Sequence, residues 1–226
     1  RQTRPIQSAA GKTADKMERV RIRKGLDLPI DGEPEQAIQG APRPGTVALI
    51  GPDHFGLRPT MAVKPGDHVK LGQLLFSDKR NPGVRFKSPG AGTVTAVHRG
   101  EKRSFLSCVV ELDEAEDAET WESVAAKPIG EQTREEIRDV LVESGLWTAF
   151  RTRPFSKVPP IHSAPRSLFV TAIDSRPLAV RPEVVIAERR DDFRDGVTVL
   201  SRLTDGPVFV CRGPSDTRST DGSSLI

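Results

Sequence analysis

The sequence has little cysteine. Its 226 residues contain only Cys108 and Cys211, which lie far apart, and neither stands in a CxxC pair. A zinc ribbon or an iron–sulfur ligand set made from this chain's own residues is therefore excluded, because both need clustered thiolates. Each cysteine lies in an apolar run, SCVVEL or VFVCRG. We therefore expect two buried, reduced cysteines of the kind found in cytoplasmic proteins.

Long hydrophobic runs are also missing. No apolar stretch approaches the roughly 20 residues that a membrane-spanning helix needs, and residues 1–16 lack the apolar core of a signal peptide. The net charge of +3 does not indicate a nucleic-acid partner. There is no GxSxG, P-loop or HExxH motif, and the four histidines stand at no metal-ligand spacing. These absences predict a soluble protein with at most peripheral membrane contact, no metal site and no catalytic residue of its own.

What is present falls into two folded parts, of which the first is rich in short strands. From residue 46 onward, alternating runs with many valines and leucines are separated by Gly- and Pro-containing turns, which is typical of a small all-β domain. We assign this domain to residues 18–112, with a disordered polar extension at residues 1–17 before it. The acidic residues 113–122 are expected to form a linker.

The second part combines a helix with parallel strands. Thr133 and Glu136 form the capping-box pattern of a helix that Gly145 ends. Beyond a proline-rich loop, the buried strand RSLFVTAID, a helical region and the buried strand GPVFVC follow, and this order predicts a βαβ unit with a parallel sheet. The expected fold class is mixed α+β: linker, helix and an incomplete Rossmann-like α/β domain occupy residues 113–211, and a disordered tail occupies residues 212–226.

Residues 63–94 carry a motif with regular glycine spacing. The string VKPGDHVKLGQLL, followed by PGAGTV, resembles the biotinyl/lipoyl barrel-sandwich family, in which Lys79 would correspond to the lysine that carries the cofactor. Pro89, in the second half-motif, follows Lys79 by ten positions, and a turn at residues 81–83 places Lys79 beside the hairpin tip. We therefore expect an unmodified scaffold, with a lipoyl or biotinyl carrier modified at Lys79 as the alternative.

Three strings, taken in order, extend the resemblance to most of the chain. They are IRKGLDLPIDGEPEQ, RPTMAVKPGDHVKLGQLLFSDKRNPGV and SGLWTAFRTRPFSKVP. Over about residues 20–210 the chain resembles the A subunit of the sodium-translocating NADH:quinone oxidoreductase (Na⁺-NQR). Members of that family are longer, so the resemblance implies a C-terminally truncated chain, and a non-functional fragment is a further alternative.

The resemblance implies a peripheral protein on the cytoplasmic face of the bacterial inner membrane. Such a protein carries no flavin or iron–sulfur centre, lies next to the membrane-embedded B subunit and has been associated with ubiquinone binding. The complex that contains it passes electrons from NADH to ubiquinone and exports Na⁺. We therefore expect no bound cofactor in this chain, ubiquinone as the substrate of the complex, and the other Na⁺-NQR subunits, chiefly the B subunit, as partners.

One aromatic and basic loop is the candidate contact site. The same stretch resembles the NADH- and FMN-binding subunit of complex I, where a glycine-rich loop cradles phosphate, but residues 147–157 contain no glycine. Its rings offer flat apolar surface, and its basic side chains offer hydrogen-bond donors to a quinone carbonyl. We expect a quinone contact or a subunit contact, or else a loop whose aromatics anchor it to the domain and whose basic side chains face the B subunit or lipid headgroups. The candidate residues are Trp147, Phe150, Arg151, Arg153, Phe155 and Lys157.

Overall fold

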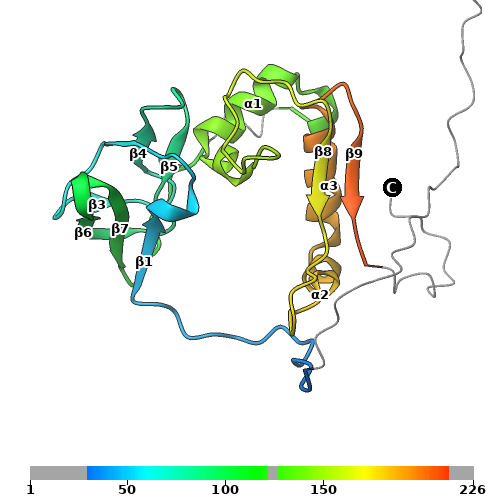
Figure 1. Ribbon diagram of the computed structural model, residues 1–226, viewed down its shortest axis with the longest axis horizontal. Coiled ribbons are helices and arrows are strands. Elements are labelled where there is room, and N and C mark those ends of the chain that lie inside the picture. The colour runs from blue at the N-terminus through cyan, green and yellow to red at the C-terminus, as the bar shows by residue number, and fades with distance from the viewer. Residues whose placement is uncertain (1–29, 122–126, 214–226) are drawn as a thin grey trace, which may run out of the picture.

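The computed structural model describes residues 30–121 and 127–213. The extension expected at residues 1–17, and residues 214–226 of the expected tail, lie outside them. A β domain and an α/β part are joined by helix α1 (Arg134–Glu143), and this mixed arrangement confirms the predicted fold class (Figure 1).

The β domain consists of two antiparallel sheets. A four-stranded sheet has the order β1-β7-β6-β3, and a three-stranded sheet has the order β2-β4-β5. The strands and the two single-turn helices between them are β1 (Thr46–Ile50), η1 (Gly51–Asp53), β2 (Pro59–Met61), β3 (His68–Val69), β4 (Leu74–Asp78), β5 (Arg85–Lys87), β6 (Gly92–Arg99), η2 (Glu101–Arg103) and β7 (Phe105–Leu112).

The core of the β domain forms where the inward faces of the two sheets meet. Phe76 stacks on Phe86 with ring centroids 4.8 Å apart, and it meets Phe105 edge-on at 5.0 Å. Val94 and Val110 are fully buried in the same cluster. Alternate residues fill the interior along most of these strands, as expected for strands with one solvated face, while β4 buries the consecutive residues Leu75 and Phe76 at a register shift.

The acidic segment after β7 is not a free linker. The backbone N–H of Leu71 donates to the Asp117 carbonyl at 2.8 Å, and the N–H of Glu119 donates to the Leu71 carbonyl at 2.9 Å. Lys70 Nζ lies 2.9 Å from an Asp117 carboxylate oxygen. Trp121 then packs on Gly72, where an added Cβ would lie 2.8 Å from the indole. The segment up to residue 121 is thus a strap bound to the barrel, in contrast to the linker expected at 113–122.

Helix α1 begins and ends as the sequence predicts. The Thr133 hydroxyl accepts from the Glu136 N–H at 3.2 Å, and the Glu136 carboxylate accepts from the Thr133 N–H at 2.8 Å, which completes the capping box. Gly145 has φ +82°, a left-handed conformation that ends the helix. The chain then turns into η5 (Leu146–Ala149), which lies against β5.

The α/β part has the predicted strand–helix–strand order. Strands β8 (Leu168–Thr171) and β9 (Val208–Cys211) pair in parallel, and the helices between them are α2 (Pro182–Glu188) and α3 (Arg190–Ser201). A further single-turn helix, η4 (Ile129–Glu131), precedes α1 and contacts α3.

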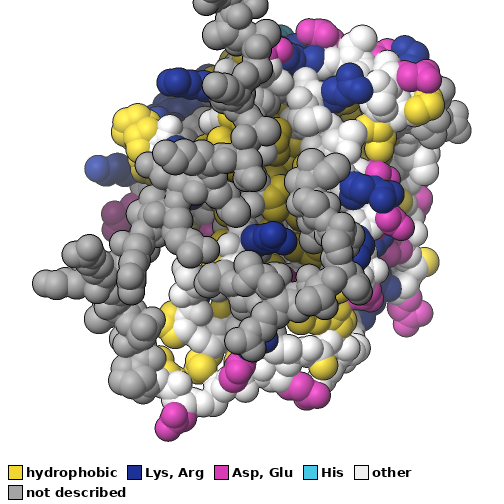
Figure 2. Space-filling view, turned by 90° about the vertical axis from the view of Figure 1, so that its right-hand side faces the viewer, with side chains coloured by type: hydrophobic (Ala, Val, Ile, Leu, Met, Phe, Trp, Pro, Cys, Tyr) yellow, Lys and Arg dark blue, Asp and Glu magenta, His cyan; other side chains and the backbone are white. Residues whose placement is uncertain are grey.

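Among the described residues, the two parallel strands are covered on one face only. Leu168 and Val170 alternate with exposed residues, and α3 packs on the strand pair. On the alternate face Phe169 and Phe209 stack with centroids 5.0 Å apart and remain 64% and 46% exposed. Figure 2 shows the side of the molecule beyond β9, where hydrophobic side chains are visible together with basic and acidic ones. The prediction of two buried strands is therefore wrong for the face that carries Phe169 and Phe209, and Cys211 is half-buried while Cys108 is fully buried.

An extended segment at the start of the described residues spans the two parts. Residues 30–44 run from β1 to the beginning of α2 (Figure 1). There the Arg181 guanidinium lies 2.6 Å from a Glu33 carboxylate oxygen, and the Arg181 N–H donates to the Gln36 side-chain oxygen at 2.8 Å. Within the described ranges, no helix is both long and apolar enough to cross a membrane.

Candidate functional site

Two of the six candidate loop residues are held in the β-domain core. Trp147 is 5% exposed and belongs to the same cluster as Phe76 and Phe86. Its indole N–H donates to the Pro159 carbonyl at 2.9 Å, and Phe150 meets the indole edge-on at 5.2 Å. These two rings join the segment after α1 to the barrel, so they offer little surface to a ligand.

Of the remaining loop residues, Arg151 folds back on His54 and the backbone before it, whereas Arg153, Phe155 and Lys157 belong to a short closed turn. The N–H of Thr152 donates to the Lys157 carbonyl, and the N–H of Ser156 donates to the Thr152 carbonyl, both at 2.8 Å. Phe155 lies within this turn and is 71% exposed, and Arg153 is also exposed. Because two backbone amides of the turn are already satisfied internally, the loop is not the open cradle of N–H groups that phosphate binding uses.

The hairpin that carries Lys79 is packed on one side, although the Lys79 side chain itself is exposed. Lys79 lies in the turn between β4 and β5, and its N–H donates to the Arg58 carbonyl at 2.8 Å. The Asn81 side-chain amide donates to the carbonyls of Val158 and Pro159 at 3.0 and 3.2 Å. A lysine carrier needs a hairpin tip that another enzyme can reach from all sides. Here the segment after the loop packs on that tip, which favours the unmodified scaffold.

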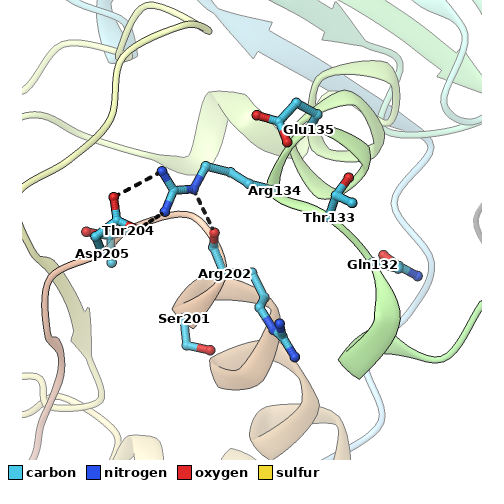
Figure 3. A pocket seen from close by; sticks show the side chains of 8 residues that line it. All are labelled: Gln132, Thr133, Arg134, Glu135, Ser201, Arg202, Thr204 and Asp205. Atoms are coloured by element: carbon cyan, nitrogen blue, oxygen red, sulfur yellow. Dashed lines mark hydrogen bonds and ion pairs between the residues drawn. The ribbon is translucent and has the colours of Figure 1, made fainter.

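A polar hollow of about 540 Å³ lies where α1 meets the turn between α3 and β9. Arg134 donates to the Arg202 carbonyl at 3.1 Å and pairs with the Asp205 carboxylate (Figure 3). The hydrogen bond between Arg134 and Asp205 raises the pKa of Arg134 and lowers that of Asp205. Arg202 in turn donates to the Gly130 carbonyl at 2.6 Å. Both guanidinium groups therefore clamp backbone segments together, and the hollow is best explained as a structural joint. No three His, Cys, Asp or Glu side chains gather as a metal site in the described residues.

A second, apolar pocket of about 360 Å³ lies between the barrel, the strap and the segment after α1. Phe86 forms part of its floor, and the ring of His54 meets Phe86 edge-on at 4.7 Å. Trp121, carried by the strap, forms another wall, and Lys87 is held beside it by Glu119 at 3.3 Å. The lining residues are Leu49, His54, Leu71, Gly72, Phe86, Lys87, Ser88, Trp121, Ser144, Gly145, Leu146 and Thr148.

His54 is the polar group of this pocket whose protonation state is fixed by its surroundings. Burial lowers its pKa below 6.5, and the positive charge of Arg151 lowers it further. An Arg151 guanidinium nitrogen lies 3.3 Å from His54 Nδ1, and because a guanidinium can only donate, Nδ1 must accept. The neutral ring therefore carries its proton on Nε2, and His54 is a lining residue of the pocket.

The lowered pKa of His54 predicts a pH-dependent stability. In the unfolded chain His54 takes up a proton near pH 6.5, whereas in the folded chain it does so only at lower pH. The free energy of unfolding should therefore fall as the pH drops from about 7.5 toward the lowered pKa of the folded state. Urea unfolding at about pH 7.5 and about pH 5.5 measures the loss, and the variant His54→Phe should lose less over the same interval. An equal loss in both chains would mean that His54 is not the titrating group.

The pocket residues were not predicted from the sequence. His54 had no metal-ligand spacing, and Trp121 stood in a segment expected to be a linker. Phe86, His54 and Trp121 come together only through sheet pairing and the strap, so no local spacing signals them. The one available clue was a tryptophan within an otherwise acidic run, because a large aromatic ring in such a segment usually has something to pack on.

Comparisons with known proteins cover both parts of the chain. A model described as the NqrA N-terminal barrel-sandwich hybrid domain matches residues 20–113, and one described as the NqrA second alpha/beta domain matches residues 132–225. The A subunit of the Na(+)-translocating NADH-quinone reductase of Marinomonas sp. is 53% identical over 192 residues, and the alignment covers 85% of this chain and 43% of that protein.

Two further relatives bear the same name. The Pseudomonas aeruginosa protein is 54% identical over 193 residues, which cover 85% of this chain and 43% of that protein. The Alcanivorax borkumensis protein is 52% identical over 196 residues, which cover 87% of this chain and 44% of that protein. The chain therefore spans less than half the length of these curated relatives.

Proposed function

The chain belongs to the NqrA family, the A subunits of the Na⁺-translocating NADH-quinone reductases, and we propose that it serves as a cofactor-free, peripheral component of such a complex. The proposal rests on sequence identity. Over 85% of the chain, about half of the residues are identical to those of relatives that bear this name. Flavins and iron–sulfur centres of partner subunits would carry the electrons from NADH, and this chain would help to bind ubiquinone.

The proposal that the chain holds no dinucleotide or flavin has support in the loop after α1. Trp147 and Phe150 occupy the region where a phosphate-binding loop would need small residues, and both rings pack in the core. The amides of Thr152 and Ser156 donate to carbonyls within the loop itself. A pyrophosphate would have to displace these hydrogen bonds, and it would meet side chains where such loops have glycine.

The apolar pocket is the place where ubiquinone fits best. A quinone head group is flat and mostly apolar, and it carries two carbonyl oxygens that accept hydrogen bonds. Phe86 and Trp121 supply aromatic surface, and the Nε2–H of His54 supplies a donor. Of the six loop candidates, Arg151 contributes through His54, because its guanidinium fixes the tautomer that leaves Nε2 free to donate.

We also propose the place of the chain in the assembly. As a protein without a membrane-crossing helix in its described residues, it would lie peripherally on the cytoplasmic face of the bacterial inner membrane, with the membrane-embedded B subunit as its chief partner. Co-purification of the 226-residue chain with the other subunits from membranes tests this. Recovery of the B subunit with an unmodified Lys79 is the expected result, and recovery of the chain alone would contradict it.

Quinone binding is tested by fluorescence. A short-tailed ubiquinone, added to the full chain, should quench the emission of Trp121, which lines the pocket, and spare that of buried Trp147. We expect the variant His54→Phe to bind about fivefold more weakly, because it loses one hydrogen bond worth roughly 1 kcal/mol but keeps an aromatic ring. The variant Trp121→Phe should lose the quenchable emission.

The matched control is His162→Phe, which changes an exposed histidine outside the pocket and should leave the quenching curve unchanged. Quenching that persists in Trp121→Phe, or equal affinity in His54→Phe and the parent chain, would place the quinone elsewhere. Neither result would touch membership of the complex, which the co-purification measures separately.

A further inference from the structure

We propose that an aromatic and basic surface next to the apolar pocket docks the chain on the surface of an anionic lipid bilayer. This surface, termed the loop patch, is formed by the tip of the loop after α1, the segment after η1 and the β4–β5 turn. Its members are Phe55, Phe155, Arg58, Lys79, Arg80, Arg151, Arg153 and Lys157, all of them exposed.

The two aromatic rings of the loop patch are the most exposed large hydrophobic side chains of the described residues. Phe55 is 69% exposed and Phe155 is 71% exposed. Lys157 connects them, because its Nζ lies 5.4 Å from the Phe55 ring centroid and it closes the turn that carries Phe155. Exposed phenylalanines cost free energy in water, and their burial at a headgroup–acyl boundary recovers it.

The cations of the loop patch outnumber its acids. Six Lys and Arg side chains surround the rings, and the neighbouring acids are Asp53 and Asp78. Asp78 is partly engaged, since its carboxylate accepts from the N–H groups of Arg58 at 3.1 Å and Arg80 at 2.9 Å. Arg80 also donates to the Gly56 carbonyl at 3.3 Å, which joins the turn to the segment that bears Phe55. A surface with excess positive charge attracts anionic headgroups.

The shape of the loop patch favours a bilayer over a protein partner. Neither the polar hollow nor the apolar pocket is lined by any residue of the patch, so the patch offers no concave site for an anchor side chain of a protein partner. Phe155 instead sits in a projecting turn between Thr152 and Lys157. Projecting rings surrounded by long cationic side chains can enter a fluid interface while the charged ends remain in the headgroups.

Docking by the loop patch would also place the apolar pocket near the membrane. His54, which lines the pocket, is the chain neighbour of Phe55 and accepts from Arg151. A lipid-soluble ligand could then reach the pocket from the interface. The docking proposal rests on the patch itself and not on quinone binding or on the partner subunits.

The test is co-sedimentation of the 226-residue chain with protein-free vesicles. We expect binding to phosphatidylcholine vesicles that contain phosphatidylglycerol, weak binding to pure phosphatidylcholine, and loss of binding at high salt. The double variant F55S/F155S should lower the partition coefficient at least about tenfold. The double variant R153Q/K157Q should lower it about fivefold for each cation removed.

The control is F169S/F209S, which removes the other exposed phenylalanine pair, on the β8–β9 sheet, and should bind vesicles like the parent chain. The basic residues 1–24 are identical in every variant, so differences among variants report on the patch. Absence of vesicle binding, or equal binding by F55S/F155S and the parent, would overturn the proposal. If F55S/F155S kept vesicle binding but lost co-purification with the other subunits, the patch would be a protein contact.

Discussion

Replacing Trp147 with alanine is expected to lower the free energy of unfolding by about 3–5 kcal/mol. The indole is 5% exposed and fills space in the β-domain core, although it comes from the segment after α1. Its loss also leaves the Pro159 carbonyl without the indole N–H donor at 2.9 Å. Because Trp147 joins the two parts of the chain, urea unfolding followed by circular dichroism should show a lower midpoint and a broader transition.

The matched variant is Phe155→Ala, eight positions later in the same loop. That side chain is 71% exposed, so its removal should change the free energy of unfolding by no more than about 0.5 kcal/mol. The two variants distinguish a ring that packs in the core from a ring that is exposed to solvent, since only Trp147→Ala should lower the free energy of unfolding substantially. Similar stabilities for Trp147→Ala and the parent chain would show that the segment after α1 is not anchored in the barrel.

The elements that local chemistry specifies could be predicted from the sequence. The capping box at Thr133 and Glu136 satisfies backbone amides within one helical turn. Gly145 ends the helix because its own backbone adopts a left-handed conformation, which depends on no distant contact. The short strands between residues 46 and 112 follow from alternation and turn residues. In each case the determining contacts lie within a few residues, so the pattern is visible in the string itself.

The features that depend on distant contacts could not be predicted. The acidic strap resembles a linker in composition, and it is bound because Leu71, some 46 positions away from Asp117, offers both of its backbone groups to it. Strand β9 looks buried because VFVC is apolar, yet only the pairing geometry shows that Phe209 stacks on Phe169 at an exposed face. The apolar pocket has the same origin, since His54, Phe86 and Trp121 share no sequence spacing.

The loop candidates show how one sequence motif can serve two purposes. Aromatic and basic residues are interspersed from Trp147 to Lys157, and the sequence alone does not distinguish rings that pack from rings that project. The structure separates them, with Trp147 and Phe150 toward the core and Phe155 toward solvent. The deciding factor is the closed turn at Thr152, which reverses the chain after Phe150.

Replacing Gly92 with alanine is expected to destabilise the barrel by about 3 kcal/mol, the upper end of ordinary overpacking costs. Gly92 opens β6, and an added Cβ would lie 1.9 Å from the Glu111 carbonyl oxygen and 2.8 Å from its carbon, both in the backbone of β7. Backbone atoms of a paired strand cannot rotate away as a side chain does, so the strands must separate locally. The matched control is Gly196→Ala in α3, for which we expect a higher free energy of unfolding instead of a lower one.

Nothing in the described structure lies within 4 Å of a Cβ added at Gly196, and alanine has the higher helix propensity. This second variant should therefore gain about 0.5–1 kcal/mol, because it removes backbone freedom from the unfolded chain without a clash. Urea unfolding of both variants under one condition measures the contrast. Equal shifts in the same direction would show that glycine content, and not the close approach of β7, sets the outcome. A loss confined to Gly92→Ala would show that the close approach of β6 to the backbone of β7 at this position stabilises the barrel.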